Sequence, residues 1–211
     1  MYLILTRKGI AIDVTNPATE DIDIGDIAAG LANVCFAPGR TARPITAAEF
    51  AIAMCNTAER ELGINDPAGQ LAALLAIAQM AYVPALDPMQ ADLWGSKLIG
   101  VHMHLHRAIA SRFCLRSACA SYAHGLKAAY THTEASMVRD LFATQQSMSF
   151  SIPAEKLSLS WLQFDRDRYQ EGSGVWTRAF LDTFNRISDA RIARAVPTTW
   201  PDNLQGAQHV A

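Results

Sequence analysis

The side chains best suited to binding a metal are three histidines at alternate positions, His102, His104 and His106. On a helix, His102 and His106 stand one turn apart on one face, as two metal ligands can, while His104 points away. No third ligand can be identified for them. We therefore favour a structural or surface role, with one divalent transition metal held by His102 and His106 as the alternative. The histidines at positions 124, 132 and 209 lie in unrelated contexts and are expected to be solvated.

The four cysteines form neither a Cys-x-x-Cys pair nor the spacing of a zinc site. Cys35 and Cys55 lie within apolar helical patterns, which favours buried, reduced thiols. The sequence also contains no Gly-rich phosphate loop and no Gly-x-Ser-x-Gly elbow, and Cys114 has no base near it. The common nucleophilic and phosphate-loop enzymes therefore receive little support.

A small β element and a series of helices must position these residues. Residues 2–14 predict a β-hairpin, in which Gly9 supplies the positive φ of the turn. A helical apolar period then predicts a first helix over residues 24–35. Residues 46–49, Thr-Ala-Ala-Glu, form a capping box, so a second helix is expected over about 47–62.

Asp66 and Pro67 repeat this start signal and predict a helix to about residue 82. That helix is apolar nearly all round, which is typical of the buried centre of a bundle. Further helices are expected at about 96–113, 117–130, 134–147 and 175–194. The prediction is an all-α single domain over residues 1–196, with the small N-terminal hairpin, followed by a loose tail over 197–211.

Three blocks of sequence resemble HD-domain phosphohydrolases, in the branch of the 5′-deoxynucleotidases. They are Asp-Ile-Ala-Ala-Gly-Leu-Ala-Asn at 26–33, Gly-Arg-Thr-Ala-Arg-Pro-Ile-Thr-Ala-Ala-Glu-Phe at 39–50, and Leu-Leu-Ala-Ile-Ala-Gln-Met-Ala-Tyr at 74–82. In that branch the second block ends Ala-Glu-His, and the third reads Leu-Leu-His-Asp-Ala followed by Glu-Ala-Tyr. The order and spacing of the blocks carry the resemblance, which covers most of the chain and implies an HD-domain-like helical bundle.

The resemblance also implies that every metal ligand of the family has become apolar. Phe50 stands in the place of the first His, Ala76 and Ile77 replace the His-Asp pair, and Val138 replaces a later Asp. HD enzymes use these ligands to hold a divalent ion that activates water. Apolar side chains have no lone pair for a metal. We therefore expect no catalytic residues, no cofactor, and a dry, packed core at these degenerate ligand positions.

Arg43 matches an arginine that the family has beside its substrate, where it can meet a phosphate through two hydrogen bonds. Without a metal, Arg43 either still binds a nucleotide phosphate or pairs with a carboxylate of this chain. Glu49 is also kept, but its place in the capping box explains it without a functional role.

Composition and charge narrow the classes of partner. The chain has 211 residues, half of them apolar, and a net charge of -2, which gives no electrostatic basis for binding nucleic acid. Its longest apolar stretch, residues 71–86, is interrupted by Gln79 and Pro84 and is shorter than the ~20 residues that a bilayer requires. We expect a cytoplasmic protein that does not enter a membrane.

Two functional hypotheses follow. The first is a catalytically inactive pseudoenzyme that acts by binding a partner protein or a nucleotide, and the resemblance implies a homodimer by analogy. The second is a divergent metal-dependent nucleotide phosphohydrolase whose metal site has moved to His102 and His106.

Overall fold

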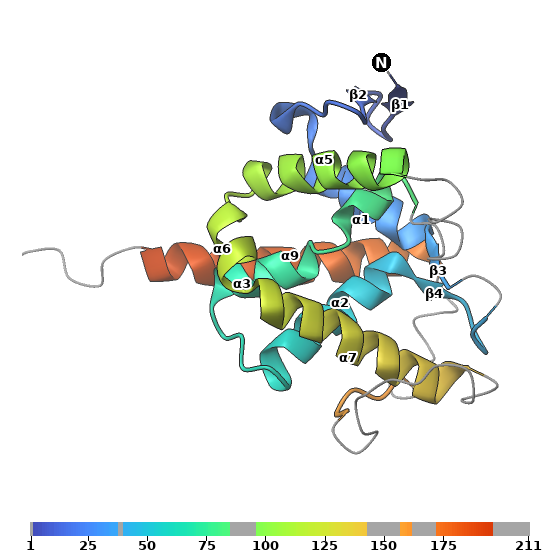
Figure 1. Cartoon of the computed structure of the whole chain (residues 1–211), viewed down its shortest axis with the longest axis vertical. Coiled ribbons are helices and arrows are strands. Elements are labelled where there is room, and N and C mark those ends of the chain that lie inside the picture. The colour runs from blue at the N-terminus through green and yellow to red at the C-terminus, as the bar shows by residue number, and fades with distance from the viewer. Residues whose placement is uncertain (1, 38–39, 85–95, 143–156, 162–171, 196–211) are drawn as a thin grey trace, which may run out of the picture.

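The computed structural model describes residues 2–37, 40–84, 96–142, 157–161 and 172–195. In this part of the chain the protein is mainly helical, with two small antiparallel sheets of two strands each (Figure 1). The mainly helical architecture and the N-terminal hairpin are confirmed. The HD-domain-like assignment and the single domain remain predictions, and the tail over 197–211 lies outside the described residues.

The N-terminal hairpin pairs β1 (Leu3–Leu5) with β2 (Ala11–Asp13) on the outer side of α5 (Figure 1). Gly9 adopts a φ of 80° in the turn, a conformation that costs glycine little because it has no Cβ. The side chain of Ile12 is fully buried and attaches the hairpin to the core. A 3-10 helix, η1 (Thr19–Asp21), leads from the hairpin to the bundle.

Helix α1 (Ile24–Asn33) begins at Asp23, whose Oδ1 accepts hydrogen bonds from the amides of Gly25 and Asp26 at 2.8 and 3.1 Å. The predicted helix ran to Cys35, which is wrong by two residues. Cys35 and Phe36 instead form β3, which pairs with β4 (Ile45–Thr46). Strands of two residues leave no alternation in a sequence, so this sheet was not predicted.

Helix α2 (Ala47–Arg60) starts where the capping box predicts, because Thr46 Oγ1 accepts a hydrogen bond from the amide of Glu49 at 3.1 Å. Most of its side chains are buried, since it packs against α1, α3, α7 and α9. Helix α2, and not the 67–82 segment alone, therefore forms the centre of the bundle.

Helix α3 (Pro67–Leu74) also starts as predicted, with Asp66 Oδ2 accepting from the amide of Gly69 at 3.2 Å. The predicted continuation to residue 82 is wrong. After Leu74 the hydrogen bonds tighten to the 3-10 pattern, and a separate short helix, η2 (Ala78–Ala81), follows. This turn brings Ala81 directly against Gly30 of α1.

Helix α5 (Ser96–Arg112) agrees with the prediction, and α6 (Arg116–Ser121) is a short helix near the start of the predicted 117–130 segment. The predicted separation of 117–130 from 134–147 is wrong, because α7 (Ala123–Leu141) crosses it without a break. The hydroxyls of Thr131 and Thr133 bond to carbonyls four residues earlier, so these residues do not end the helix. Residues 143–147 lie outside the described part.

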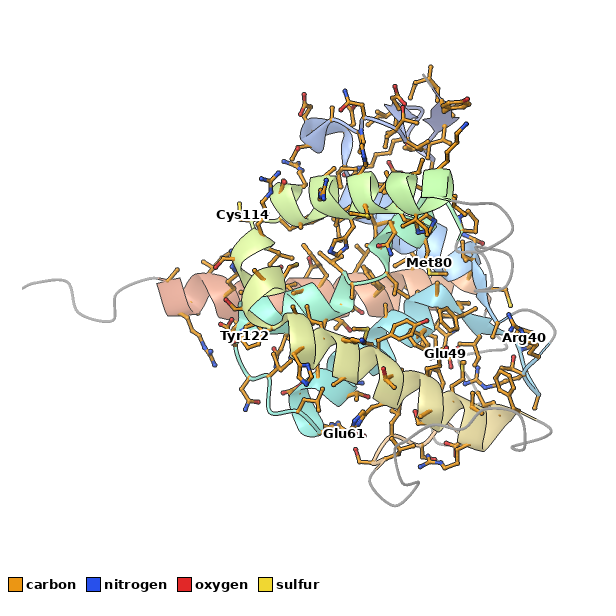
Figure 2. All side chains as sticks on the ribbon, in the orientation of Figure 1. Arg40, Glu49, Glu61, Met80, Cys114 and Tyr122 are labelled. Carbon is orange, nitrogen blue, oxygen red and sulfur yellow. The ribbon has the colours of Figure 1, made fainter. Side chains whose placement is uncertain are left out.

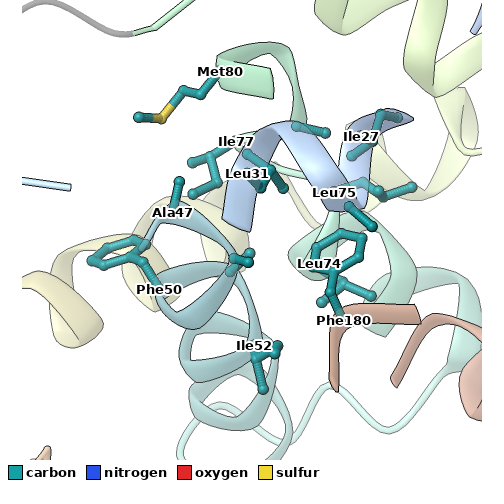
Figure 3. Close-up of a cluster of buried hydrophobic side chains, with 14 of the residues drawn as sticks. Ile27, Leu31, Ala47, Phe50, Ile52, Leu74, Leu75, Ile77, Met80 and Phe180 are labelled. Atoms are coloured by element: carbon teal, nitrogen blue, oxygen red, sulfur yellow. The ribbon is translucent and has the colours of Figure 1, made fainter. Parts of the chain in front are cut away.

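The last helix, α9 (Ser173–Ala195), confirms the predicted 175–194 segment and packs against α1, α3 and α2. These contacts enclose the main apolar core. Figure 3 shows Ile27 and Leu31 of α1 facing the side chains of α2, α3 and α9, among them Leu74 and Phe180. The core therefore joins elements from both ends of the sequence.

The contact between α1 and η2 leaves no room for a side chain at Gly30. A Cβ there would lie 2.6 Å from the carbonyl oxygen and 2.7 Å from the Cβ of Ala81. We expect Gly30→Ala to lower the free energy of unfolding by about 1–3 kcal/mol, as overpacking does.

Gly100→Ala is the matched control, because a Cβ on this α5 residue meets no described atom within 4 Å. It should raise stability by about 0.5–1 kcal/mol. Urea unfolding measures both, and equal shifts in the two variants would contradict the close packing.

Candidate functional site

The degenerate ligand positions come from three segments of the bundle. Phe50 lies on α2, Ala76 and Ile77 lie between α3 and η2, and Val138 lies on α7. Phe50 is fully buried, and Ile77 and Val138 are each 5 % exposed. Phe50 and Ile77 belong to the main core (Figure 3). Ala76 is only partly buried and faces a second, smaller apolar cluster beside Met54 and Ala129. The structure thus brings Phe50 and Ile77 into one core and turns Ala76 away from it.

Phe50 is surrounded by aromatic rings. Its ring stacks on Phe36 with centroids 4.1 Å apart, and it contacts Tyr130 at 5.4 Å and Trp161 at 6.2 Å. We call Phe36, Phe50, Tyr130 and Trp161 the aromatic cluster. Offset and tilted ring pairs of this kind stabilise a core beyond the area that they bury. The side chains of β3, α2, α7 and residue 161 therefore fill the volume around Phe50.

Tyr130 contributes the one hydroxyl of the aromatic cluster. Burial raises the pKa of Tyr130 to about 12, and the carboxylate of Glu134 raises it as well. The phenol therefore stays protonated at neutral pH and supplies no anionic oxygen to a cation.

Arg43 pairs with a buried carboxylate. Its Nη1 donates to Glu49 Oε2 at 3.1 Å, its Nη2 donates to Glu49 Oε1, and Nη1 also meets the carbonyl of Pro44. Glu49 is fully buried in the first turn of α2 (Figure 2), whereas the Arg43 side chain is 22 % exposed. Burial raises the pKa of Glu49, and the Arg43 guanidinium opposes that rise. The structure shows Arg43 paired with a carboxylate of this chain, and phosphate binding by Arg43 stays a prediction.

The histidines of α5 divide as their spacing predicts, with His102 and His106 partly buried and His104 exposed. Burial lowers the pKa of both His102 and His106, which favours neutral imidazoles. The Nε2 atom of His102 is buried and has no hydrogen-bond partner among the described residues. Within the same part of the chain, however, no three His, Cys, Asp or Glu residues are grouped so that they could hold a metal ion.

Residues 157–161 form a feature that the sequence did not predict. We call this segment, Leu-Ser-Leu-Ser-Trp, the strap. Glu61, at the end of α2, holds its first half through one carboxylate oxygen. Oε1 accepts hydrogen bonds from the Ser158 amide at 2.8 Å, the Ser158 hydroxyl at 2.7 Å and the Leu159 amide at 3.2 Å. The second oxygen lies 2.8 Å from Nδ1 of His132, so the expectation that His132 is solvated is wrong.

One face of α7 holds the rest of the strap. Arg139 donates to the carbonyls of Leu157 and Leu159 at 3.0 and 2.6 Å, and Asp140 accepts from the amide of Trp161 at 2.8 Å. Ser136 accepts from the indole nitrogen of Trp161 at 3.0 Å. His132, Ser136, Arg139 and Asp140 follow helical spacing, and that polar stripe on a helix of mixed composition was the sequence signal for this site.

The cysteines are all free thiols, and they are less uniform than predicted. Cys55 is buried on α2, and burial raises its pKa to about 12, so it is an unreactive core residue. The expectation of a buried thiol is wrong for Cys35, which is exposed, and Cys114 is exposed as well. Cys35 is exposed because side chains alternate along β3, where its neighbour Phe36 points into the core.

None of the helices in the described ranges has the length and apolar character needed to cross a bilayer. No family model matches the chain, and no curated protein matches its sequence. The resemblance to HD phosphohydrolases therefore depends on the three sequence blocks alone.

Proposed function

We propose that this chain is a non-catalytic protein, related to the HD phosphohydrolases, that acts by binding a partner. The observation that carries the proposal is the aromatic cluster around Phe50. The resemblance aligns Phe50 with the first metal ligand of the family. A fully buried ring stacked on two others offers neither a lone pair nor room for an ion with its water.

The loss of the other ligands supports the same proposal. A metal site without its metal is a set of buried polar groups that destabilises the fold, whereas apolar replacements stabilise it once catalysis is not required. Ile77 and Val138 are buried apolar residues of this kind. A protein whose metal ligands have been replaced by core side chains can still act through its surface, by binding other molecules.

The state of Arg43 favours a protein partner over a nucleotide. A phosphate that binds Arg43 would share the guanidinium with the buried Glu49 carboxylate, so two anions would compete for one cation. A protein partner need not bring an anion to Arg43. By analogy with the resemblance, a second copy of this chain is also a candidate partner.

Metal analysis tests the proposal. Protein purified without chelator or added metal should contain close to zero transition metal per chain by plasma mass spectrometry. The same sample, with added Mn²⁺ or Co²⁺, should release no phosphate from deoxynucleoside monophosphates, because a water-activating ion is not held.

About one metal per chain, together with phosphate release that His102→Ala abolishes, would reject the proposal in favour of the divergent hydrolase. His104→Ala is the matched control, since His104 lies on the same helix but is exposed. Loss of phosphate release in both variants would indicate damage to α5 and not a metal ligand at His102.

A further inference from the structure

The outer edge of β1 carries main-chain groups that are available for pairing. In the hairpin, the amide of Thr6 donates to the carbonyl of Ile10 at 2.9 Å. Bonded and non-bonded residue pairs alternate along an antiparallel ladder, so the register places Leu3 and Leu5 in non-bonded pairs. Their amides and carbonyls therefore point away from β2. Within the described part of the chain, no hydrogen bond reaches these groups.

The side chains on this edge are apolar and exposed. Side chains alternate along a strand, so Leu3 and Leu5 share the face opposite Ile4, which packs against the main core. Leu3 is 52 % exposed and Leu5 is 74 % exposed, at the margin of the molecule (Figure 1). Natural edge strands are commonly protected by a charged residue or a proline, and residues 2–6 contain neither. The edge of β1 is therefore unprotected against pairing with another strand.

The edge of β2 is protected. Asp13 stands on this edge, and its carbonyl already accepts a hydrogen bond from the amide of Asn16 at 3.1 Å. Its carboxylate accepts from the hydroxyl of Thr15 at 2.6 Å and places a charge beside the strand. A charged residue at an edge disfavours pairing with another chain. The hairpin thus offers one edge for pairing, which is that of β1.

We propose that β1 pairs with β1 of a second copy of this chain, in an antiparallel sheet with the order β2-β1-β1-β2. A strand that pairs with itself in this way lies on a two-fold axis, as most homodimer interfaces do. With the axis at Ile4, Leu3 of each copy stands opposite Leu5 of the other. The outward amides and carbonyls of both leucines then bond to one another. This inference rests on the proposed binding function, because it names one partner and the surface that meets it.

The side chains and charges favour a second copy as the occupant. Each leucine meets a leucine across the axis, and apolar cross-strand pairs stabilise a sheet. The cations Arg7 and Lys8 follow β1 in the chain. Antiparallel pairing places those of the two copies at opposite ends of the interface, whereas parallel pairing would place them side by side. A strand of three residues buries a small area, so we expect a weak dimer that forms at high concentration.

Sedimentation velocity tests the interface on the full chain, purified without an N-terminal tag. Between about 1 μM and about 1 mM, the range of weak affinities, the average mass should rise from that of one chain, 23.0 kDa, toward twice that value. A mass that stays at one chain over the whole range would overturn the proposal.

Proline variants locate the interface. Leu5→Pro removes an outward amide of β1 from each copy and should weaken the dimer at least about tenfold. Ala11→Pro is the matched control, because Ala11 stands directly opposite Leu5 and its amide points to the other edge of the hairpin. This control should leave the dimer unchanged. Equal effects of the two prolines, in variants that circular dichroism shows to be folded, would assign the dimer to another surface and reject the proposal.

Charge variants test the register without changing the main chain. One variant combines Leu3→Lys with Leu5→Glu, and the other combines Leu3→Lys with Leu5→Lys. In the proposed register the first places Lys opposite Glu across the axis, and the second places Lys opposite Lys. The first should therefore dimerise at least about tenfold more tightly than the second at low salt. Both change the same exposed leucines, so a difference in folding is not expected, and equal association would overturn the antiparallel register.

The metal test is independent of these measurements. A monomeric protein that is metal-free and releases no phosphate would reject the β1 interface alone. A metal-dependent phosphatase would reject the proposed function, whatever its oligomeric state.

Discussion

Phe50→Ala should lower the free energy of unfolding by about 3–5 kcal/mol, the loss typical of a buried phenylalanine. The ring is fully buried and contacts Phe36, Tyr130 and Trp161, which come from three other segments, so no single neighbour can move into the space it leaves. Urea unfolding followed by circular dichroism measures the loss. Trp161 fluorescence should change in the native state, because its stacking partner is removed.

Phe113→Ala is the control for this variant. Phe113 is only partly buried and makes one edge-to-face contact, with Phe184 at 5.3 Å, so its truncation should cost less. If Phe50→Ala costs no more than Phe113→Ala, then Phe50 does not fill the core as described. The proposal that an apolar core stands in place of a metal site would lose its main support.

Arg43→Ala should cost about 3 kcal/mol, because it leaves the Glu49 carboxylate buried without its cation. The loss should depend on pH. Burial raises the pKa of Glu49 above the ordinary 4.5, so the folded state keeps a proton that the unfolded chain releases, and stability falls as pH rises through that window. Arg43 limits the rise, and its removal should make the loss larger near pH 7 than near pH 4.

Arg60→Ala, an exposed arginine at the end of the same helix, should change stability by less than about 0.5 kcal/mol at either pH. A melting-temperature measurement with a nucleotide tests the alternative role of Arg43. If a deoxynucleoside monophosphate raises the melting temperature of the wild type and not of Arg43→Ala, then Arg43 binds a phosphate, and the preference for a protein partner is wrong.

The starts of α2 and α3 were predicted well because each depends on one local side-chain hydrogen bond. Thr46 and Asp66 cap their helices as expected, and Gly9 makes the predicted turn. The end of the helix that begins at Pro67 was predicted poorly. The run after Leu74 is uniformly apolar, so its sequence gives no sign that the chain tightens to bring Ala81 against Gly30. The tightening of the helix after Leu74 depends on contact with α1 and not on the sequence of the segment itself.

The candidate site shows the same contrast between features set by local sequence and features set by distant packing partners. Sequence identified Phe50 as a core residue and Arg43 as a residue with two alternatives, but the partner of Arg43 depends on the fold between β4 and α2. The strap could not be predicted, because five residues without periodicity take their conformation from Glu61 and α7. Those contacts join positions nearly a hundred residues apart in the case of Ser158 and Glu61.

The packing of α1 against α9 has a consequence for how the protein is made. A ribosome extends the chain at about 5–20 residues per second, so α9 is completed on the order of ten seconds after α1. During that interval Ile27 and Leu31, which are fully buried in the finished protein, lack the helix that covers them. The nascent chain therefore cannot cover these two side chains fully until α9 is synthesised.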